Sequence, residues 1–277
     1  MKPALFTYHR PGTLPDALAL MAEHRGGARV LAGGQSLMPL MAMRMTRPEQ
    51  LVDINRIDEL KGIRDTGDTL TIGALTRYSE ILRAPLIADS LPLLSEAIRH
   101  VAHHAIRNRG TIGGSLALAD PSAETPATCL ALCARIVARS SAGEREISVD
   151  AFFEGLMSTA LAEDEILVAV RIPKRPAKVP HAFLEFARRK GDYAQAGIIL
   201  APSHGGVAEN RAVVFGIGST ARRSAALEGA MTNGLSAEAK AALQQEVTAI
   251  IDDDEGAAYK LPIVMTLAER AMGRLKP

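Results

Sequence analysis

Two short runs of small residues are the part of this sequence best suited to binding chemistry. The first glycine segment is AGGQS, made of Ala32, Gly33, Gly34, Gln35 and Ser36; the second glycine segment is TIGGS, made of Thr111, Ile112, Gly113, Gly114 and Ser115. Because glycine has no Cβ, successive backbone N–H groups can turn toward one anion, and a ligand can approach the main chain closely. One glycine pair alone is most often just a tight turn. Two of them predict a shared pyrophosphate site, and therefore a nucleotide cofactor.

Cysteine and histidine offer little for metal chemistry. Cys129 and Cys133 are too few for an iron–sulfur cluster, and their i, i+4 spacing predicts two buried thiols on one helix face. His100, His103 and His104 include a pair four residues apart that could share a metal ion, but no third ligand follows nearby. We expect these histidines to be solvated or to cap a helix, and we expect no metal site.

Charged residues around the second glycine segment have two interpretations each. Arg107 and Arg109, with Asn108 between them, precede the segment and could balance the charge of a cofactor or form ordinary ion pairs. Asp120 is followed by a proline and could simply start a turn. The sequence leaves these choices open.

The overall composition excludes several classes of partner. The chain has 277 residues, with 32 Lys and Arg against 31 Asp and Glu, which gives a formal net charge of +1. This balance does not indicate binding to nucleic acid or to an anionic membrane. No run reaches the ~18 apolar residues of a membrane span, and the first residues lack the apolar region of a signal peptide. We expect a cytoplasmic protein without a membrane span.

The elements that must position the first glycine segment lie in residues 1–58. A helix is predicted to begin at Leu14, because apolar residues at 14, 17, 18 and 21 have helical spacing and Thr13 can cap it, and the pair Gly26-Gly27 stops it. Strands are predicted over 30–31 and 51–54, and the glycine segment directly follows the earlier one. Open α/β sheets usually bind ligands at such strand ends.

Residues 59–173 form a second predicted module. A strand is expected over 70–72, and the stretch 106–126 is expected to be an irregular loop, because it is rich in glycine, proline and polar residues. The remaining predictions are helices over 78–83 and 91–101 and antiparallel strands over 136–139, 145–149 and 166–172.

The last third of the chain predicts a separate domain. Residues 174–181 contain prolines and lysines and predict a linker. Strands precede helices in residues 182–277, which is typical of an α+β layer domain. The predicted strands cover 182–188, 196–201 and 212–218, and the predicted helices cover 224–231, 237–251 and 258–272.

Four stretches carry a resemblance to a known family. They are AGGQSLMPLMAMR, IRNRGTIGGSLALADPSAE, FARRKGDYAQAG and DEGAAYKLPIVMTLAERAM, in this order. Together they resemble the medium, FAD-binding subunit of the carbon monoxide dehydrogenase and xanthine dehydrogenase family of molybdenum hydroxylases, over essentially the whole chain. The resemblance implies an α+β fold of the vanillyl-alcohol-oxidase (PCMH) type, in which two α/β modules enclose FAD and a C-terminal α+β domain of three to four antiparallel strands and three helices covers it.

The resemblance also implies roles for individual residues. The two glycine segments would form the two walls of the pyrophosphate site. Glu124 stands where the family commonly has an aspartate that touches the cofactor. Leu167 matches a position that packs against the flavin, and Tyr193 matches a residue close to the isoalloxazine ring.

Three positions depart from the family pattern. Ser115 replaces a usual asparagine, so a contact that needs an amide is lost or replaced by one from a shorter hydroxyl. Gln35 stands where histidine is frequent. Since glutamine cannot make the covalent flavin link that histidine makes in related flavoproteins, we expect noncovalent FAD. Glu124 is one methylene longer than the usual aspartate.

The resemblance implies a division of labour among subunits. Molybdopterin would lie on a large subunit and two [2Fe–2S] clusters on a small subunit, in a dimer of heterotrimers. This chain would take electrons from the clusters and pass them to an external acceptor, without catalytic acid–base residues of its own. Neither the substrate nor the acceptor follows from the sequence.

Two other functions remain possible at the sequence level. A self-sufficient flavoenzyme of the same fold would need an acid or base near Tyr193, and the sequence does not identify one. A scaffold that has lost its flavin would be compatible with the replacements at Ser115 and Glu124. The colour of the purified protein distinguishes the scaffold from the flavoproteins.

Overall fold

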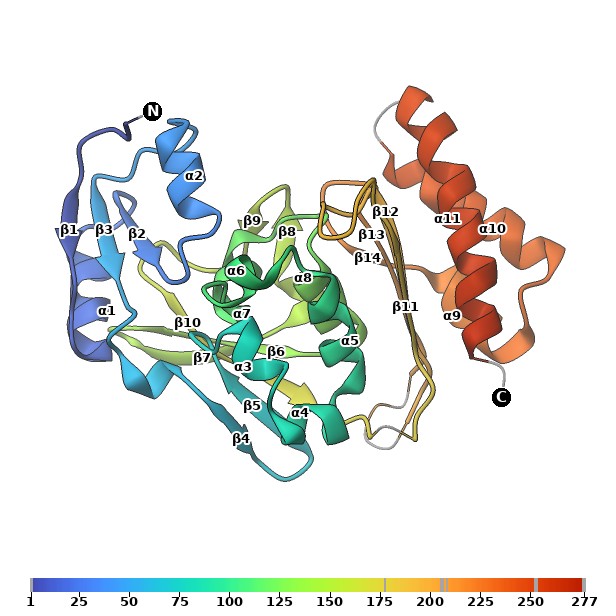
Figure 1. The fold of residues 1–277 in the computed structure, drawn as a ribbon, viewed down its shortest axis with the longest axis horizontal. Coiled ribbons are helices and arrows are strands. Elements are labelled where there is room, and N and C mark those ends of the chain that lie inside the picture. Colours follow the sequence, from blue (N-terminus) through green and yellow to red (C-terminus); the bar gives the residue numbers. More distant parts are fainter. Residues whose placement is uncertain (1, 177, 205–206, 208, 252–253, 276–277) are drawn as a thin grey trace.

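Three sheets with their helices follow one another along the long axis of the molecule (Figure 1). Each sheet together with its helices is one region, and the regions are numbered first to third in chain order. The computed structural model describes residues 2–176, 178–204, 207, 209–251 and 254–275. The N-terminal sheet and the C-terminal helices lie at opposite ends, and the middle sheet lies between them (Figure 1).

The first sheet is small and parallel. Its strand order is β1-β3-β2, with β1 (Thr7–His9) and β2 (Ala28–Leu31) both parallel to β3 (Gln50–Asp53). Helix α1 (Leu14–Glu23) buries its apolar face, and Thr13 caps it by accepting a hydrogen bond from the N–H of Asp16. The short helix α2 (Leu37–Ala42) follows the first glycine segment. The sequence predicts α1, β2 and β3 but not β1, because three mostly exposed residues carry no periodic signal.

The second sheet has five antiparallel strands in the order β4-β5-β10-β6-β7. The central strand β10 carries a register shift between Leu167 and Ala169, where it pairs with β6. The strands are β4 (Ile63–Asp65), β5 (Thr69–Gly73), β6 (Arg135–Ser140), β7 (Gly143–Ser148) and β10 (Ile166–Pro173), and a hairpin of β8 (Phe153–Gly155) and β9 (Ser158–Thr159) stands apart.

The stretch predicted as an irregular loop over 106–126 is largely helical. It contains α7 (Ile112–Leu118) and the start of α8 (Glu124–Ala131), separated by a turn after Ala119, whose φ is +54°. Tertiary packing overrides the low helix propensity of glycine here, since Ile112, Gly113 and Leu116 are buried. The neighbouring helices are α3 (Tyr78–Ile81), α4 (Pro85–Ser90), α5 (Pro92–His100) and α6 (His104–Arg107), with short 3-10 turns η1 (Asp58–Leu60) and η2 (Val149–Ala151).

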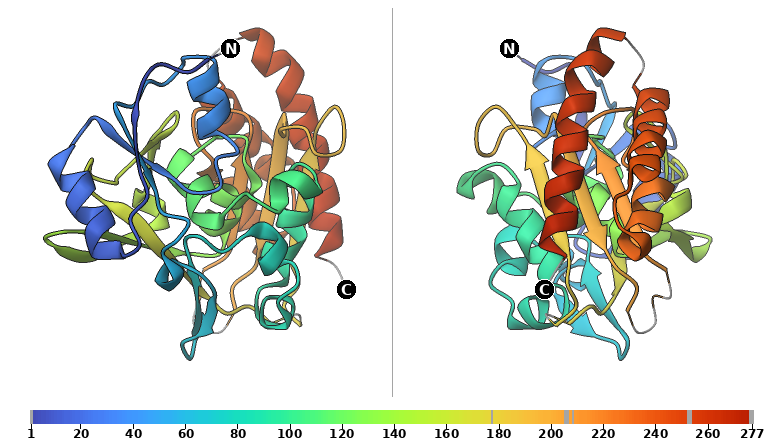
Figure 2. Two further views of the ribbon diagram at one scale, coloured as in Figure 1. Left: turned by 60° about the vertical axis from the view of Figure 1, so that its left-hand side comes forward. Right: turned by 90° about the vertical axis from the view of Figure 1, so that its right-hand side faces the viewer.

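The third sheet is antiparallel, in the order β11-β12-β13-β14, and its helices cover one face (Figure 2). Its strands are β11 (Ala182–Phe186), β12 (Ala196–Ala201), β13 (Arg211–Phe215) and β14 (Arg222–Arg223). The helices are α9 (Ala225–Asn233), α10 (Ala237–Ile250) and α11 (Asp254–Arg274). This agrees with the α+β layer predicted from the order of strands and helices.

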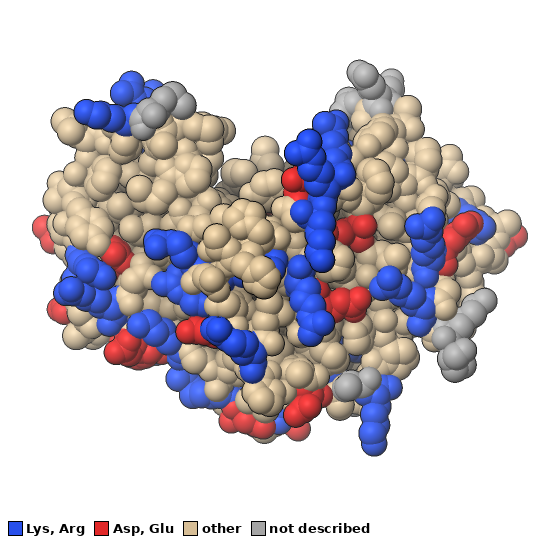
Figure 3. Space-filling view, viewed as in Figure 1, with Lys and Arg blue, Asp and Glu red and all other residues tan. Residues whose placement is uncertain are grey.

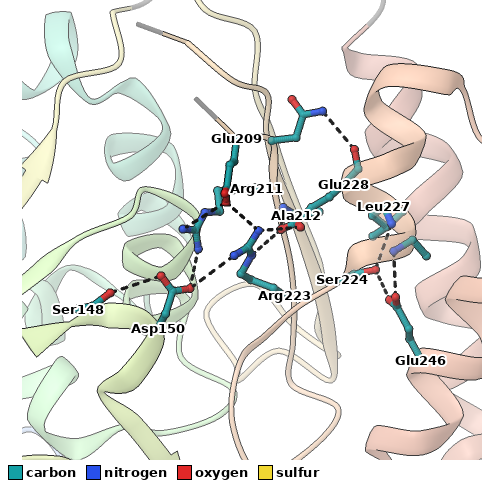
Figure 4. Close-up of polar contacts among 12 residues, drawn as sticks. Ser148, Asp150, Glu209, Arg211, Ala212, Arg223, Ser224, Leu227, Glu228 and Glu246 are labelled. Carbon is teal, nitrogen blue, oxygen red and sulfur yellow. Dashed lines mark hydrogen bonds and ion pairs between the residues drawn. The ribbon is translucent and has the colours of Figure 1, made fainter. Parts of the chain in front are cut away.

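The opposite face of the third sheet packs on the second region. Phe183 and Phe215 belong to the core that also contains Leu94 of α5 and Leu130 of α8. An ion-pair network reinforces this contact: Asp150 of η2 lies 2.6 Å from the guanidinium of Arg211 on β13 (Figure 4). The third region is therefore firmly packed against the second.

Residues 174–181 were predicted to be a linker, and most of them are held by contacts. The backbone N–H of Arg175 donates to the carbonyl of Ser90 at 2.7 Å, and that of Lys174 donates to the carbonyl of Asp68 at 2.9 Å. The Arg175 side chain is 3% exposed and donates to the carbonyl of Pro202. Ala177 lies outside the described residues.

Charged side chains of both signs are exposed on the face of the molecule drawn in Figure 3. Acidic and basic side chains are both spread over the face in Figure 3, which is hollowed between the N-terminal part and the remainder. Within the part of the chain that the structure describes, no helix is both long and apolar enough to cross a membrane.

Candidate functional site

A cleft of about 840 Å³ runs between the first and second regions. It is lined by residues from both glycine segments together with Glu124, Leu167 and Tyr193. Of the thirteen residues singled out from the sequence, only Ile112 is not among the lining residues; it is fully buried in the core of the second region. The volume falls within the range of about 300–1,000 Å³ that is usual for ligand sites.

The first glycine segment forms a turn at the end of β2. Gly34 has a φ of +73°, a conformation that L side chains rarely adopt. Across the described residues, no hydrogen bond uses the backbone N–H groups of Gly33, Gly34, Gln35 or Ser36. These N–H groups remain available to a ligand, as we expect for a glycine segment that binds an anion through its backbone.

The second glycine segment is built differently, because it is the first turn of α7. Its N–H groups already have partners: Ile112 donates to the carbonyl of Thr76 at 3.2 Å, and Gly113 donates to the carbonyl of Ala74 at 3.0 Å. Gly114 donates to Oγ1 of the cap residue Thr111 at 3.1 Å, and Ser115 donates to the Thr111 carbonyl. The expectation that this segment also offers free backbone N–H groups to the pyrophosphate is therefore wrong for these four residues.

The glycines of the second segment serve close packing instead. A Cβ on Gly113 would lie 2.5 Å from the Cβ of Ala74 and 2.8 Å from its Cα. A Cβ on Gly114 would lie 2.8 Å from Oγ1 of Thr111. Glycine lets α7 lie directly on the chain at Ala74, which places the first turn of the helix beside the cleft.

The two glycine segments meet each other. A Cβ on Gly33 would lie only 2.3 Å from the carbonyl oxygen of Arg109 and 3.0 Å from the Cα of Gly110. On the other side, a Cβ on Gly114 would be 3.7 Å from the Cβ of Ala32. Segments some eighty positions apart therefore meet at the cleft, as the prediction of a shared site requires.

Arg77 joins the two segments, and sequence reasoning missed it. Its guanidinium donates to the side-chain oxygen of Asn55 at 2.6 Å and also to the carbonyl of Arg109. Asn55 in turn donates from Nδ2 to the carbonyl of Ala32 at 2.8 Å. No local sequence pattern predicts this connection, because its four members come from four separate parts of the chain.

Glu124 lies at the start of α8, with 6% of its surface exposed. Burial raises the pKa of its carboxyl to about 8, and the nearby Glu185 and Asp120 carboxylates also raise it. An ordinary glutamate would be ionised at pH 7. Glu124 therefore carries a proton at neutral pH and presents a carboxylic acid to the cleft.

Tyr193 stands in the loop between β11 and β12, and 63% of its surface is exposed. Partial burial of the phenol raises its pKa, with further contributions from Asp120 and Glu124, so the three groups lie near one another. Asp120 also accepts a hydrogen bond from the N–H of Ser122 at 2.9 Å, which is the turn expected from the sequence.

Leu167 enters the cleft at the irregularity in β10. The register of β10 against β6 shifts between Leu167 and Ala169. Such a bulge redirects the side chains beside it. Leu167 is 5% exposed and belongs to the core of the second region, so it is a rigid apolar contact at the cleft wall.

Several predictions for polar residues need correction. Arg107 is buried and donates to the carbonyls of Val101 and Ala102 at 2.6 and 3.0 Å; within the described part of the chain it has no ion pair and does not line the cleft. His100 is not merely solvated or capping, since its Nδ1 lies 2.9 Å from Oε1 of Glu185. Among the described residues, no cluster of three or more potential metal ligands is present.

The two cysteines do not share a helix face. Cys129 is buried within α8, but Cys133 lies beyond the end of that helix with a φ of +54° and is partly exposed. Periodicity could not show that α8 ends at Ala131.

Comparison with known proteins places this site in a family. Residues 4–175 match the family described as FAD binding domain in molybdopterin dehydrogenase. The beta subunit of caffeine dehydrogenase from Pseudomonas sp. strain CBB1 is 39% identical, covering 99% of this chain and 96% of its own length. The carbon monoxide dehydrogenase medium chain of Hydrogenophaga pseudoflava is 36% identical, covering 98% of this chain and 97% of its own.

Solved structures show the same architecture. A carbon monoxide dehydrogenase from Hydrogenophaga pseudoflava that lacks the Mo-pyranopterin moiety of its cofactor matches with a TM-score of 0.91 and 36% identity, over 99% of this chain and 98% of that one. Quinoline 2-oxidoreductase from Pseudomonas putida 86 matches with a TM-score of 0.88 and 32% identity, over the full length of both chains. The chain belongs to the FAD-binding medium subunits of the carbon monoxide dehydrogenase and xanthine dehydrogenase family.

Proposed function

We propose that this chain binds FAD noncovalently in the cleft and passes electrons from the iron–sulfur clusters of a small partner subunit to an external acceptor. FAD would supply the ability to accept electrons singly and to release them singly or in pairs. The protein contributes binding, orientation and the electrostatic setting.

The meeting of the two glycine segments at one cleft carries this proposal. The free N–H groups of Gly33, Gly34, Gln35 and Ser36 would hold the pyrophosphate. The Thr111 and Ser115 side chains line the opposite wall. The absence of a Cβ on Gly33 lets the two walls approach, and Arg77 fixes their separation.

Three further residues that line the cleft suit an isoalloxazine ring, which would lie beside them. Leu167 offers an apolar surface, Tyr193 an aromatic side chain, and Glu124 a neutral carboxylic acid. Gln35 has no group that could attach covalently to a flavin, which supports noncovalent binding.

Partner subunits complete the proposed activity. The relatives are named as subunits of multi-subunit dehydrogenases. We propose a large molybdopterin subunit and a small [2Fe–2S] subunit, assembled as a dimer of heterotrimers, with substrate oxidation on the large subunit. A cytoplasmic location remains a prediction from the sequence.

Reduction by the small subunit tests the proposal directly. The purified chain should carry FAD that is released by denaturation. Mixing it with the reduced small subunit should bleach the flavin absorption. A chain that stays colourless after incubation with FAD would overturn the proposal in favour of a flavin-free scaffold.

A self-sufficient flavoenzyme is the second candidate, because Glu124 supplies a protonated carboxyl within the cleft, close to Tyr193. Reduction of bound FAD by a small organic substrate, in the absence of any partner subunit, would favour this candidate. Bleaching only by the reduced small subunit would exclude it.

A further inference from the structure

Two acidic side chains are buried between the cleft and the outer surface of the molecule. Glu124 lines the cleft, and the side chain of Glu185 on β11 is 8% exposed. Isolated buried carboxylates are unfavourable unless they are paired or protonated. The surroundings of these two groups therefore decide where protons reside.

The pleat of β11 points Glu185 toward the second region. Side chains two positions apart share a face of a strand, and Phe183 packs in the core with α5 and α8. Glu185 lies on that same face. Its Oε1 is 2.9 Å from Nδ1 of His100, whose ring is 4.8 Å from that of Phe183.

His100 connects this buried group with solvent. It is the last residue of α5, and 39% of its side chain is exposed. The hydrogen bond that His100 donates to Glu185 raises the pKa of His100, and the negative charges of Glu185 and Glu96 raise it further. Its imidazole can therefore take a proton from water near neutral pH and hold it beside Glu185.

The groups that face Glu124 favour the protonated form of its carboxyl. Burial is the main reason that its pKa rises to about 8; Glu185 and Asp120 raise it further and His100 lowers it. Tyr78 and Tyr193 also face Glu124, but burial raises both of their pKa values, so they keep their protons at neutral pH. Oε2 of Glu185 is buried and has no hydrogen-bond partner among the described residues, which leaves one oxygen free to accept a proton.

We infer that His100, Glu185 and Glu124 form a proton relay between solvent and the flavin end of the cleft. This inference rests on the proposed function. With FAD bound and reduced, Glu124 would serve as the proton donor in the cleft, and loss of its O–H proton would leave a carboxylate. Glu185 then delivers a proton from the His100 imidazolium to the Glu124 carboxylate, directly or through water, and His100 regains its proton from solvent. When Glu124 regains a proton from the cleft side, the same three side chains would return one proton to solvent.

The protonation of Glu124 can be measured before any flavin chemistry. The infrared spectrum of the FAD-free protein should show a protonated-carboxyl band at pH 6 that disappears near pH 9 and is missing in Glu124→Gln. A carboxyl band unchanged by this substitution would overturn the assignment of the proton to Glu124.

The relay itself is tested by proton uptake. The FAD-loaded protein is reduced by the reduced small subunit, and a pH-indicator dye follows protons taken from solvent at pH 7. His100→Ala, which lies outside the cleft lining, should slow uptake at least about tenfold, and added imidazole should restore the rate. His104→Ala, at an exposed histidine of the next helix, is the matched control.

Glu185→Gln should slow proton uptake as His100→Ala does, but imidazole should not rescue it. Uptake at the unaltered rate in both FAD-loaded variants would overturn the relay. Failure of the unaltered chain to bind FAD, or to be reduced by the small subunit, would instead refute the proposed function.

Discussion

The two glycine segments have similar sequences but different structures. In the first, the backbone turns after β2 and leaves four N–H groups without partners among the described residues. In the second, the four N–H groups from Ile112 to Ser115 bond to Thr76, Ala74 and Thr111. A glycine pair can therefore provide free donors for an anion, or it can let a helix pack closely against its neighbour.

The difference follows from what surrounds each segment. The first follows a strand end at the edge of the cleft, where the backbone of Arg109 and Gly110 lies closest to Gly33. The second is the start of a buried helix, where Gly113 is in contact with Ala74. Changes in the two segments should therefore have separable effects on cofactor binding and on stability.

Gly113→Val should have the largest effect on stability. Its side chain would overlap both the Cβ and the backbone of Ala74, and neither can move without displacing β5. We expect the free energy of unfolding to fall by about 3 kcal/mol, measured by urea denaturation of the FAD-free protein. Gly155→Val is the control, because no atom lies within 4 Å of a Cβ there. Equal denaturation midpoints would show that the second segment is not a packing site.

Gly33→Val should mainly abolish cofactor binding. The added side chain would collide with the Arg109 carbonyl and force the two walls of the cleft apart. We expect FAD affinity to fall at least about a hundredfold, since displaced donors leave the pyrophosphate poorly paired. Fluorescence titration with FAD measures this. Gly12→Val adds a side chain in open space. If both variants bound FAD equally well, contact between the segments would be irrelevant to binding.

Removing a hydroxyl group from either segment should have the smallest effect. In the second segment the loss should be one of stability, and in the first it should be one of FAD affinity. Thr111→Val removes the oxygen that caps α7 and should cost about 1 kcal/mol of stability. Ser36 makes no capping hydrogen bond to α2. Ser36→Ala should therefore leave stability unchanged and weaken FAD binding about fivefold. Denaturation and FAD titration of both variants check this pair. A loss of stability in Ser36→Ala would remove the distinction between the segments.

Local signals made much of the fold predictable. Helix α1 has a cap at Thr13 and apolar residues at helical spacing, and β12 is a continuous apolar run between polar turns. The strands β1, β4, β8, β9 and β14 are not predicted, because two or three residues are too few to show a period. Helix α7 was missed because only its packing on Ala74 offsets two glycines in its first turn.

The candidate site could likewise be predicted only in part from the sequence. The glycine segments could be recognised from composition alone, and twelve of the thirteen singled-out residues line one cleft. Arg77 and Asn55 could not be recognised, because their importance lies in contacts with Arg109 and Ala32. Nor could periodicity assign His100 to Glu185, which is 85 positions away.

The sequence by itself determined which residue types reach the cleft: backbone donors freed by glycine and three hydroxyls in the glycine segments, with one carboxyl and one phenol that the resemblance to the family identified. These depend on covalent structure and local conformation, so they can be read along the chain. Only the tertiary structure decided which amides stay free and which acid keeps its proton. Hydrogen-bond satisfaction and desolvation depend on neighbours brought together from distant segments, as Ala74 is with Gly113 and Glu185 is with Glu124.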